Sequence, residues 1–301
     1  MINAESLPDP VTIATPVFVL AVVLEAIAIR CRWIAGEYET SDTATSLLMG
    51  FGSLVAGLLF GWIGAAALVW AYRFRVTEIG VSAGAIAAAF VLDDFVYYWV
   101  HRIGHRSRWF WASHVVHHSS QHYNLSTALR QTWTGELNGL FVLKLPLALM
   151  GFHPALLAFV AGLNLIYQFF IHTQAIAHLP RWVEAVFNTP SHHRVHHGRD
   201  PHYLDTNYAG VFILWDRLFG SFVAEQAAPP PRYGLVRNLG TFNPMRVALH
   251  EFVAIGRDLI LPGLTVRQRL AYLFAPPGWS HDGSRMTTDA LKRRDAASTA
   301  E

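Results

Sequence analysis

Long apolar runs alternate with short polar segments over roughly the first 172 positions of the chain. The run from 43 to 72 contains no charged residue, and about 20 apolar residues are enough for a helix to cross a bilayer. Comparable runs occupy residues 11–29, 79–100, 137–151 and 154–171. The pattern predicts an all-α integral membrane protein with about four to five membrane helices, as judged from these run lengths.

Composition supports a membrane class over a soluble one. Hydrophobic residues make up 52% of the chain, charged residues 15%, and mean hydropathy is +0.28. A net charge of +2 gives no reason to expect nucleic-acid binding. Cys31 is the only cysteine, which excludes an internal disulfide and thiolate-held zinc or iron–sulfur sites. The acidic N-terminus, with Glu5 and Asp9, is unlike a signal peptide.

Three regions are expected along the chain. Residues 1–43 hold the first span and a loop, 44–225 form a histidine-rich catalytic domain, and 226–301 form a C-terminal extension whose tail is expected to be disordered after about 282. Arg30 and Arg32 follow the first span, which predicts a cytoplasmic position for that end. Counting spans onward places the ends of the third and fifth spans on the same side, although Arg73 and Arg75 then lie outside. A helical, histidine-rich cap is therefore expected to face the cytoplasm, on the inner membrane if the source is bacterial.

Histidines are concentrated in three motifs within or next to these apolar runs. The first is HRIGH, the second HVVHH and the third HRVHH, the last with Thr189 and Pro190 as a helix start signal. Side chains three and four residues apart share one face of a helix, so each motif can direct two or three imidazoles to one point. The predicted metal ligands are His101, His105, His114, His117, His118, His193, His196 and His197.

Eight imidazoles exceed the ligand set of a single metal ion and fit two ions. Imidazole binds zinc, copper, iron and nickel, so the ligand type alone does not identify the metal. A site at the mouth of membrane helices would meet alkyl chains, and attack on an inert C–H bond requires oxygen activated by a redox metal. This setting favours a pair of iron ions.

Other polar residues are candidates for supporting roles. Asp94 lies seven residues before His101 on nearly the same helical stripe, where it could orient a ligand or serve in helix packing. Asn164, Gln168 and His172 recur every four residues; His172 is a further candidate ligand, and the other two are candidates for a supporting or a packing role. Asn124 and Arg130 could bind a lipid headgroup or fix the local loop.

The three motifs resemble the fatty acid hydroxylase/sterol desaturase superfamily of integral-membrane di-iron enzymes. The resemblance covers roughly residues 44 to 222, and the segments DFVYYWVHR, HHSSQHYNLSTALRQ and TPSHHRVHHGRD are especially similar to alkylglycerol monooxygenases. It implies two irons held by the eight histidines, with His172 as a further ligand, and O₂-dependent cleavage of an ether lipid with tetrahydrobiopterin. Arg106 stands where those enzymes carry an acidic residue.

Other functions are compatible with the sequence. Related proteins hydroxylate or desaturate ornithine lipids, fatty acyl chains, sterols or carotenoids with another electron donor, and an electron-donor protein is an expected partner. A zinc-dependent membrane hydrolase or a metal transporter is the alternative from a different class. Transport predicts ligands at mid-membrane depth, whereas these motifs lie at helix mouths and in polar segments.

Overall fold

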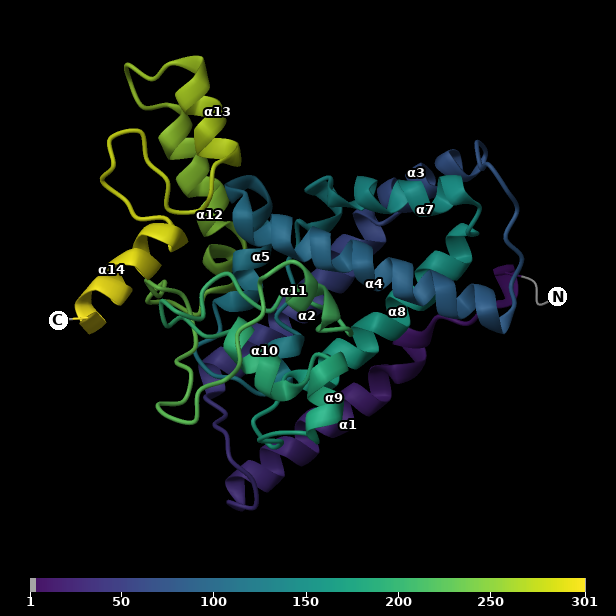
Figure 1. Cartoon of the computed structure of the whole chain (residues 1–301), viewed down its shortest axis with the longest axis horizontal. Helices are drawn as coiled ribbons and strands as arrows, with labels where there is room; N and C mark the ends of the chain where they lie inside the picture. Colours follow the sequence, from purple (N-terminus) through teal and green to yellow (C-terminus); the bar gives the residue numbers. More distant parts are fainter. Residues whose placement is uncertain (1–3, 301) are drawn as a thin grey trace.

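The computed structural model describes residues 4–300, which form helices and loops with only isolated β-bridges. A fan of long helices forms one side of the molecule, and shorter helices gather at the ends of that fan (Figure 1). The C-terminal helices lie at the periphery of this second region, well away from the N-terminus. The chain thus has a membrane-type helical part and a polar cap.

Four helices are long and apolar enough to cross a membrane: α1 (Pro10–Arg30), α2 (Thr40–Phe60), α4 (Ala83–Arg106) and α8 (Pro154–Ile171). Their N-terminal ends carry local start signals. Asp9 accepts a hydrogen bond from the Val11 amide, with proline at the first position of α1. Ser82 caps α4 in the same way.

Two of the expected spans differ in the structure. The run from 43 to 72 divides at Gly61 into α2 and α3 (Trp62–Tyr72), and a Cβ on Gly61 would lie 2.6 Å from the Gly57 carbonyl oxygen. The run from 137 to 151 is no long helix: it consists of the end of η2 (Gly135–Leu137), η3 (Leu140–Lys144) and α7 (Leu145–Met150). An 11-residue helix such as α3 extends only about 16 Å, roughly half of the hydrocarbon core.

The apolar core of the bundle lies where α4, α7 and α8 meet. Ala89, Ala148, Leu156 and Val160 are fully buried there. A second cluster joins α1 to α8 through Phe18 and Phe169, whose rings stack with centroids 4.2 Å apart. These contacts hold the histidine-bearing ends of α4 and α8 side by side.

The remaining elements form the cap around those ends. They are α5 (Arg108–His118), α6 (Leu125–Ala128), α9 (Arg181–Val186), α10 (Pro190–His196), α11 (Leu214–Leu218), α12 (Pro244–Leu259), α13 (Val266–Phe274) and α14 (Thr288–Ala300). The short helix η1 (Ala4–Ser6) is not part of the cap and lies before α1. The tail was expected to be disordered after about residue 282, but most of it forms the helix α14. Arg106 at the end of α4 binds Asp289 in α14 with two hydrogen bonds, of 3.0 and 3.1 Å.

Candidate metal centre

Nine buried or half-buried histidines from four helices converge at one end of the bundle, the end that is predicted to face the cytoplasm. They come from α4, α5, the residue that ends α8, and α10 with the residue after it. The structure sorts them into a five-histidine group and a four-histidine group, and the ligand atoms within each group lie within 4.8 Å of one another. The five-histidine group comprises His101, His105, His114, His118 and His196, and the four-histidine group comprises His117, His172, His193 and His197.

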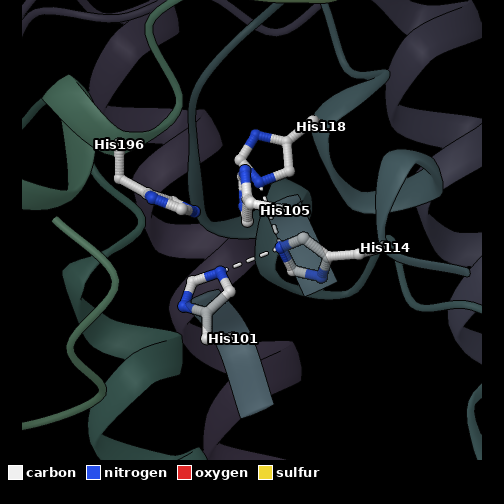
Figure 2. Close-up of side chains that lie close together, drawn as sticks. All are labelled: His101, His105, His114, His118 and His196. Carbon is white, nitrogen blue, oxygen red and sulfur yellow. Dashed lines mark hydrogen bonds between the residues drawn. The ribbon is translucent and has the colours of Figure 1, made fainter. Parts of the chain in front are cut away.

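Figure 2 shows the imidazoles of the five-histidine group directed toward a common centre. The two groups are neighbours, since the rings of His118 and His197 stack with centroids 4.5 Å apart. All eight motif histidines therefore meet in space, and His172 joins them. Two metal ions held by these groups would lie side by side.

Each HxxHH motif is divided between the two groups. His114 and His118, four residues apart on α5, point into the five-histidine group, while His117 points into the other. In the second motif His193 and His197, also four residues apart, belong to the four-histidine group, whereas His196 belongs to the five-histidine group. The division follows from helix geometry, because residues at i and i+4 share a face. The two motifs thus hold the centre from opposite sides.

Most of these imidazoles are oriented by a hydrogen bond from Nδ1. Three of these Nδ1 atoms lie beside backbone carbonyl oxygens. The distances are 2.7 Å from His101 to Tyr208, 2.6 Å from His172 to Gln168 and 2.9 Å from His196 to Thr206. A carbonyl oxygen only accepts, so the proton is on Nδ1 and the Nε2 lone pair faces the centre. This is how metal-bound histidines are usually held.

The inward nitrogens fit a metal ion better than they fit one another. The Nε2 atoms of His117 and His172 are 3.1 Å apart, although the Nδ1 of each is beside a carbonyl oxygen. Two lone pairs at that distance repel unless a cation lies between them or one ring gains a proton. The Nε2 atoms of His105, His196 and His197 are buried without any partner in the part of the chain that the structure describes. The arrangement of these nitrogen atoms therefore fits a bound metal ion.

Burial also favours the ligand form of these side chains. Removal from water lowers the pKa of His117 to about 4. Burial, followed by the neighbouring imidazoles, holds the pKa of His118, His193 and His197 well below its usual range. These rings are therefore neutral near pH 7, as metal coordination requires.

A carboxylate approaches His105 from outside the centre. Asp205 Oδ1 lies 3.3 Å from His105 Nδ1, and Asp205 Oδ2 lies 3.3 Å from Arg106 Nη1. The guanidinium of Arg106 is therefore not an unpaired charge beside the metal centre, because Asp205 and Asp289 both form ion pairs with it. Asp205, 99 residues away along the chain, thus places a carboxylate beside both Arg106 and His105.

Asp94 makes no hydrogen bond to an imidazole, so of its two expected roles the contacts favour a structural one over direct orientation of a ligand. Its carboxylate accepts hydrogen bonds from the Val211 and Phe212 amides, the Trp215 indole and Asn164. A Cβ on Gly210 would lie 2.7 Å from both the Asp94 and the Asn164 oxygens, so this approach requires glycine. Asp94 fixes the loop that carries the Tyr208 carbonyl.

The polar stripe on α8 continues this arrangement. Gln168 donates to the Asn164 side chain at 2.6 Å. The backbone carbonyl of Gln168, and not its side chain, accepts the hydrogen bond from His172 Nδ1. The side chains of Asn164 and Gln168 therefore support the loop that orients the ligands and touch no imidazole through a hydrogen bond.

Arg130 and Asn124 are also not placed to bind a lipid headgroup. Arg130 is fully buried, and its Nη2 lies 2.9 Å from Asp42 Oδ1. Asn124 caps α6 and donates to the Glu37 carbonyl at 2.7 Å. Both are engaged inside the protein, so the alternative of a local structural role is the one the contacts favour.

Sequence reasoning missed the groups that orient the ligands from the loop after α10. Asp205, Thr206 and Tyr208 lie within a dozen residues of His197 in a polar stretch. The two acids in that stretch, Asp200 and Asp205, were the only available signal. Two of the contacts are made by backbone carbonyls, which any residue type provides.

A cavity of about 280 Å³ opens onto the metal centre. His105, His118, His196 and His197 form its floor. Its walls are largely apolar and come in good part from the C-terminal extension, through residues such as Leu235, Leu239, Met286 and Leu291. The extension therefore encloses the space over the histidines.

The fold and the site define an integral membrane protein with a polyhistidine centre suited to two metal ions. The profile of the fatty acid hydroxylase family matches residues 86–221, which include all nine histidines. The chain therefore contains a fatty acid hydroxylase domain over these residues.

Curated relatives include alkylglycerol monooxygenases. Those of Xenopus tropicalis and Homo sapiens are each 37% identical over 94% of this chain, which spans 63% and 62% of their respective lengths. An ornithine lipid hydroxylase of Rhizobium tropici is 24% identical over 46% of this chain and 41% of its own length. No solved structure matches the chain.

Proposed function

We propose that this protein is a di-iron, O₂-dependent monooxygenase that hydroxylates an alkyl carbon of a membrane lipid. The observation that carries the proposal is the pair of adjacent imidazole groups at the ends of membrane-type helices. The similarity to alkylglycerol monooxygenases over 94% of the chain favours an alkylglycerol as substrate. Hydroxylation next to the ether oxygen gives a hemiacetal, which breaks into an aldehyde and a glycerol derivative.

The chain supplies the ligands, their orientation and an enclosed site. The five-histidine and four-histidine groups would each hold one iron, and the bound pair would supply the redox chemistry that activates dioxygen. Carbonyl oxygens at Tyr208, Thr206 and Gln168 keep the Nε2 atoms directed inward. The cavity over His105 and His118 has largely apolar walls and is large enough to admit part of a lipid.

The metal centre is proposed to face the cytoplasm. Arg30 ends α1 and Arg32 follows it, and Arg102 and Arg106 belong to the last turns of α4. Arg73 and Arg75 lie toward the opposite end, so the excess of arginine is on the side of the histidines. This orientation would give an electron donor, a tetrahydropterin or another reductant, access from the cytoplasm. Residues 44–225 are proposed to form the catalytic domain.

Purified protein from iron-replete cells tests the proposal. Iron bound per chain and oxygen uptake are measured with an alkylglycerol and a reduced pterin, and the matching monoacylglycerol serves as control substrate. His193→Ala should abolish uptake, whereas His202→Ala should not, because His202 is exposed and belongs to neither group. Stoichiometric zinc with turnover in the absence of oxygen would establish a hydrolase instead.

A hydroxylase of a different lipid is the second candidate. The ornithine lipid hydroxylase of Rhizobium tropici and a cholesterol 25-hydroxylase-like protein of Danio rerio align with 46% of the chain. Oxygen uptake with an ornithine lipid and none with an alkylglycerol would favour that candidate. The position of the ligands at helix ends argues against metal transport, which needs ligands along the spans.

A further inference from the structure

A second cavity, of about 270 Å³, lies behind the metal centre at the end of α4. Its lining includes Arg102 and Arg106 from α4, Lys292 from α14, and Asp205, Tyr208 and Ser221. Asp205 also lines the cavity over the histidines, so this carboxylate separates the two spaces. No residue lining the second cavity is a proposed metal ligand.

Positive charge dominates this second cavity. Arg102 and Arg106 are four residues apart, so they share a face of α4, and Lys292 adds a third cation from another helix. Asp205 is the only carboxylate among the described lining residues, and Arg106 already pairs with it and with Asp289.

Two of the three cations remain available to a ligand. Arg102 donates only to neutral oxygens, the Tyr98 hydroxyl at 2.6 Å and the Phe219 carbonyl at 3.3 Å. Lys292 is half-buried, and although the charges of Asp205 and Asp289 act on it, neither carboxylate is in ion-pair contact with it in the described part of the chain. A half-buried ammonium with no carboxylate in direct contact is costly to desolvate, and an anion in the cavity would offset that cost.

The surroundings of the cavity favour a lipid as the source of the anion. Gly220 and Ser221, which line it, directly follow α11. This helix packs along the membrane part of α4, because the rings of Trp215 and Phe95 lie 5.2 Å apart. On its outer face Leu214 and Leu218 are 42% and 69% exposed. Apolar surface at membrane depth thus leads to a cationic cavity at the end of a span.

We propose that this cavity binds the phosphate group of a phospholipid whose chains lie against α11 and α4. Arginine and lysine are the side chains that bind phosphate most strongly, arginine through its planar fork. The Tyr208 hydroxyl provides a neutral donor at the same cavity. The site is separate from the metal centre, and it binds lipid whether or not that lipid is oxidised.

Binding of short-chain lipids to the detergent-solubilised full-length protein tests this site. Dihexanoylphosphatidylglycerol supplies the phosphate, dihexanoylglycerol is the matched lipid without it, and inorganic phosphate is the soluble anion. The phospholipid should bind at least about tenfold more tightly than dihexanoylglycerol, since one charge-assisted hydrogen bond contributes roughly that factor or more. Equal binding of the two lipids overturns the proposal, as does saturation by inorganic phosphate without phospholipid binding.

Charge removal locates the site. Arg102→Gln combined with Lys292→Gln should weaken phospholipid binding at least about tenfold and leave dihexanoylglycerol binding unchanged. Arg294→Gln is the matched control, because Arg294 is exposed on the same helix as Lys292 and does not line the cavity. Full binding by the double variant, or equal loss in the control, overturns the proposal.

The measurement stays informative if the double variant does not fold. Lys292 lies on a surface helix, so Lys292→Gln alone should fold and should weaken phospholipid binding several-fold. Undiminished binding by that variant also overturns the proposal. Metal content and oxygen uptake do not enter the readout, so failure of this site and failure of the proposed oxygenase are distinguishable.

Discussion

Replacing Arg130 with methionine should destabilise the protein strongly, because Arg130 forms a buried ion pair with Asp42. The side chains are 1% and 3% exposed, and Nη2 lies 2.9 Å from Oδ1. Without the guanidinium, the Asp42 carboxylate stays buried with hydrogen bonds from Ser120 and the His122 amide alone. Breaking a buried ion pair from one side costs about 3–5 kcal/mol, so the free energy of unfolding should fall by that amount.

Denaturant unfolding in detergent, followed by circular dichroism, measures this loss. Arg257→Met is the control, because Arg257 is exposed on α12 and should change stability by less than about 0.5 kcal/mol. The double variant Asp42→Asn/Arg130→Met should lose less than the two single losses added together, since neither charge is then left unpaired.

A particular result would refute the reasoning about Arg130. If Arg130→Met unfolds like the wild type while lipid binding falls, then Arg130 contacts the headgroup and the buried pair has no structural importance. Loss of metal together with stability agrees with the present account, because the Arg130 carbonyl lies 3.3 Å from His117 Nδ1.

Further predictions concern the metal centre and the loop beside it. His193→Ala leaves three imidazoles in the four-histidine group, whereas His105→Ala leaves four in the other, so metal analysis should show the greater loss for His193→Ala; equal losses would contradict the division. Asp94→Asn should lower the free energy of unfolding by about 1–3 kcal/mol, because buried donors lose their acceptor. The folded variant should keep its metal, and parallel metal loss would contradict a purely supporting role. For the metal-free protein, the pKa of His117 is about 4 when folded and about 6.5 when unfolded. The unfolded state then binds more protons between these pH values, so stability should fall as pH drops from 6.5 toward 4; a flat unfolding profile would contradict this.

The sequence by itself determined the helices and the spacing of the ligands on them. Apolar runs long enough to span a membrane identified α1, α2, α4 and α8, because length and hydropathy are local properties. The spacings of four residues between His101 and His105 and between His114 and His118 place each pair on one helical face before any tertiary contact forms.

Only the tertiary structure decided how the nine histidines divide into two groups. That division depends on how α4, α5, α8 and α10 cross, and these helices are brought together by packing between distant segments. Asp205 reaches His105 across 100 residues, and Asp42 reaches Arg130 across 88. The spacing of ligands is set within one helix. The partner of a buried charge is set by how two distant segments pack against each other. For that reason the sequence predicted the metal ligands but left the roles of Asp94 and Arg130 open between two alternatives each.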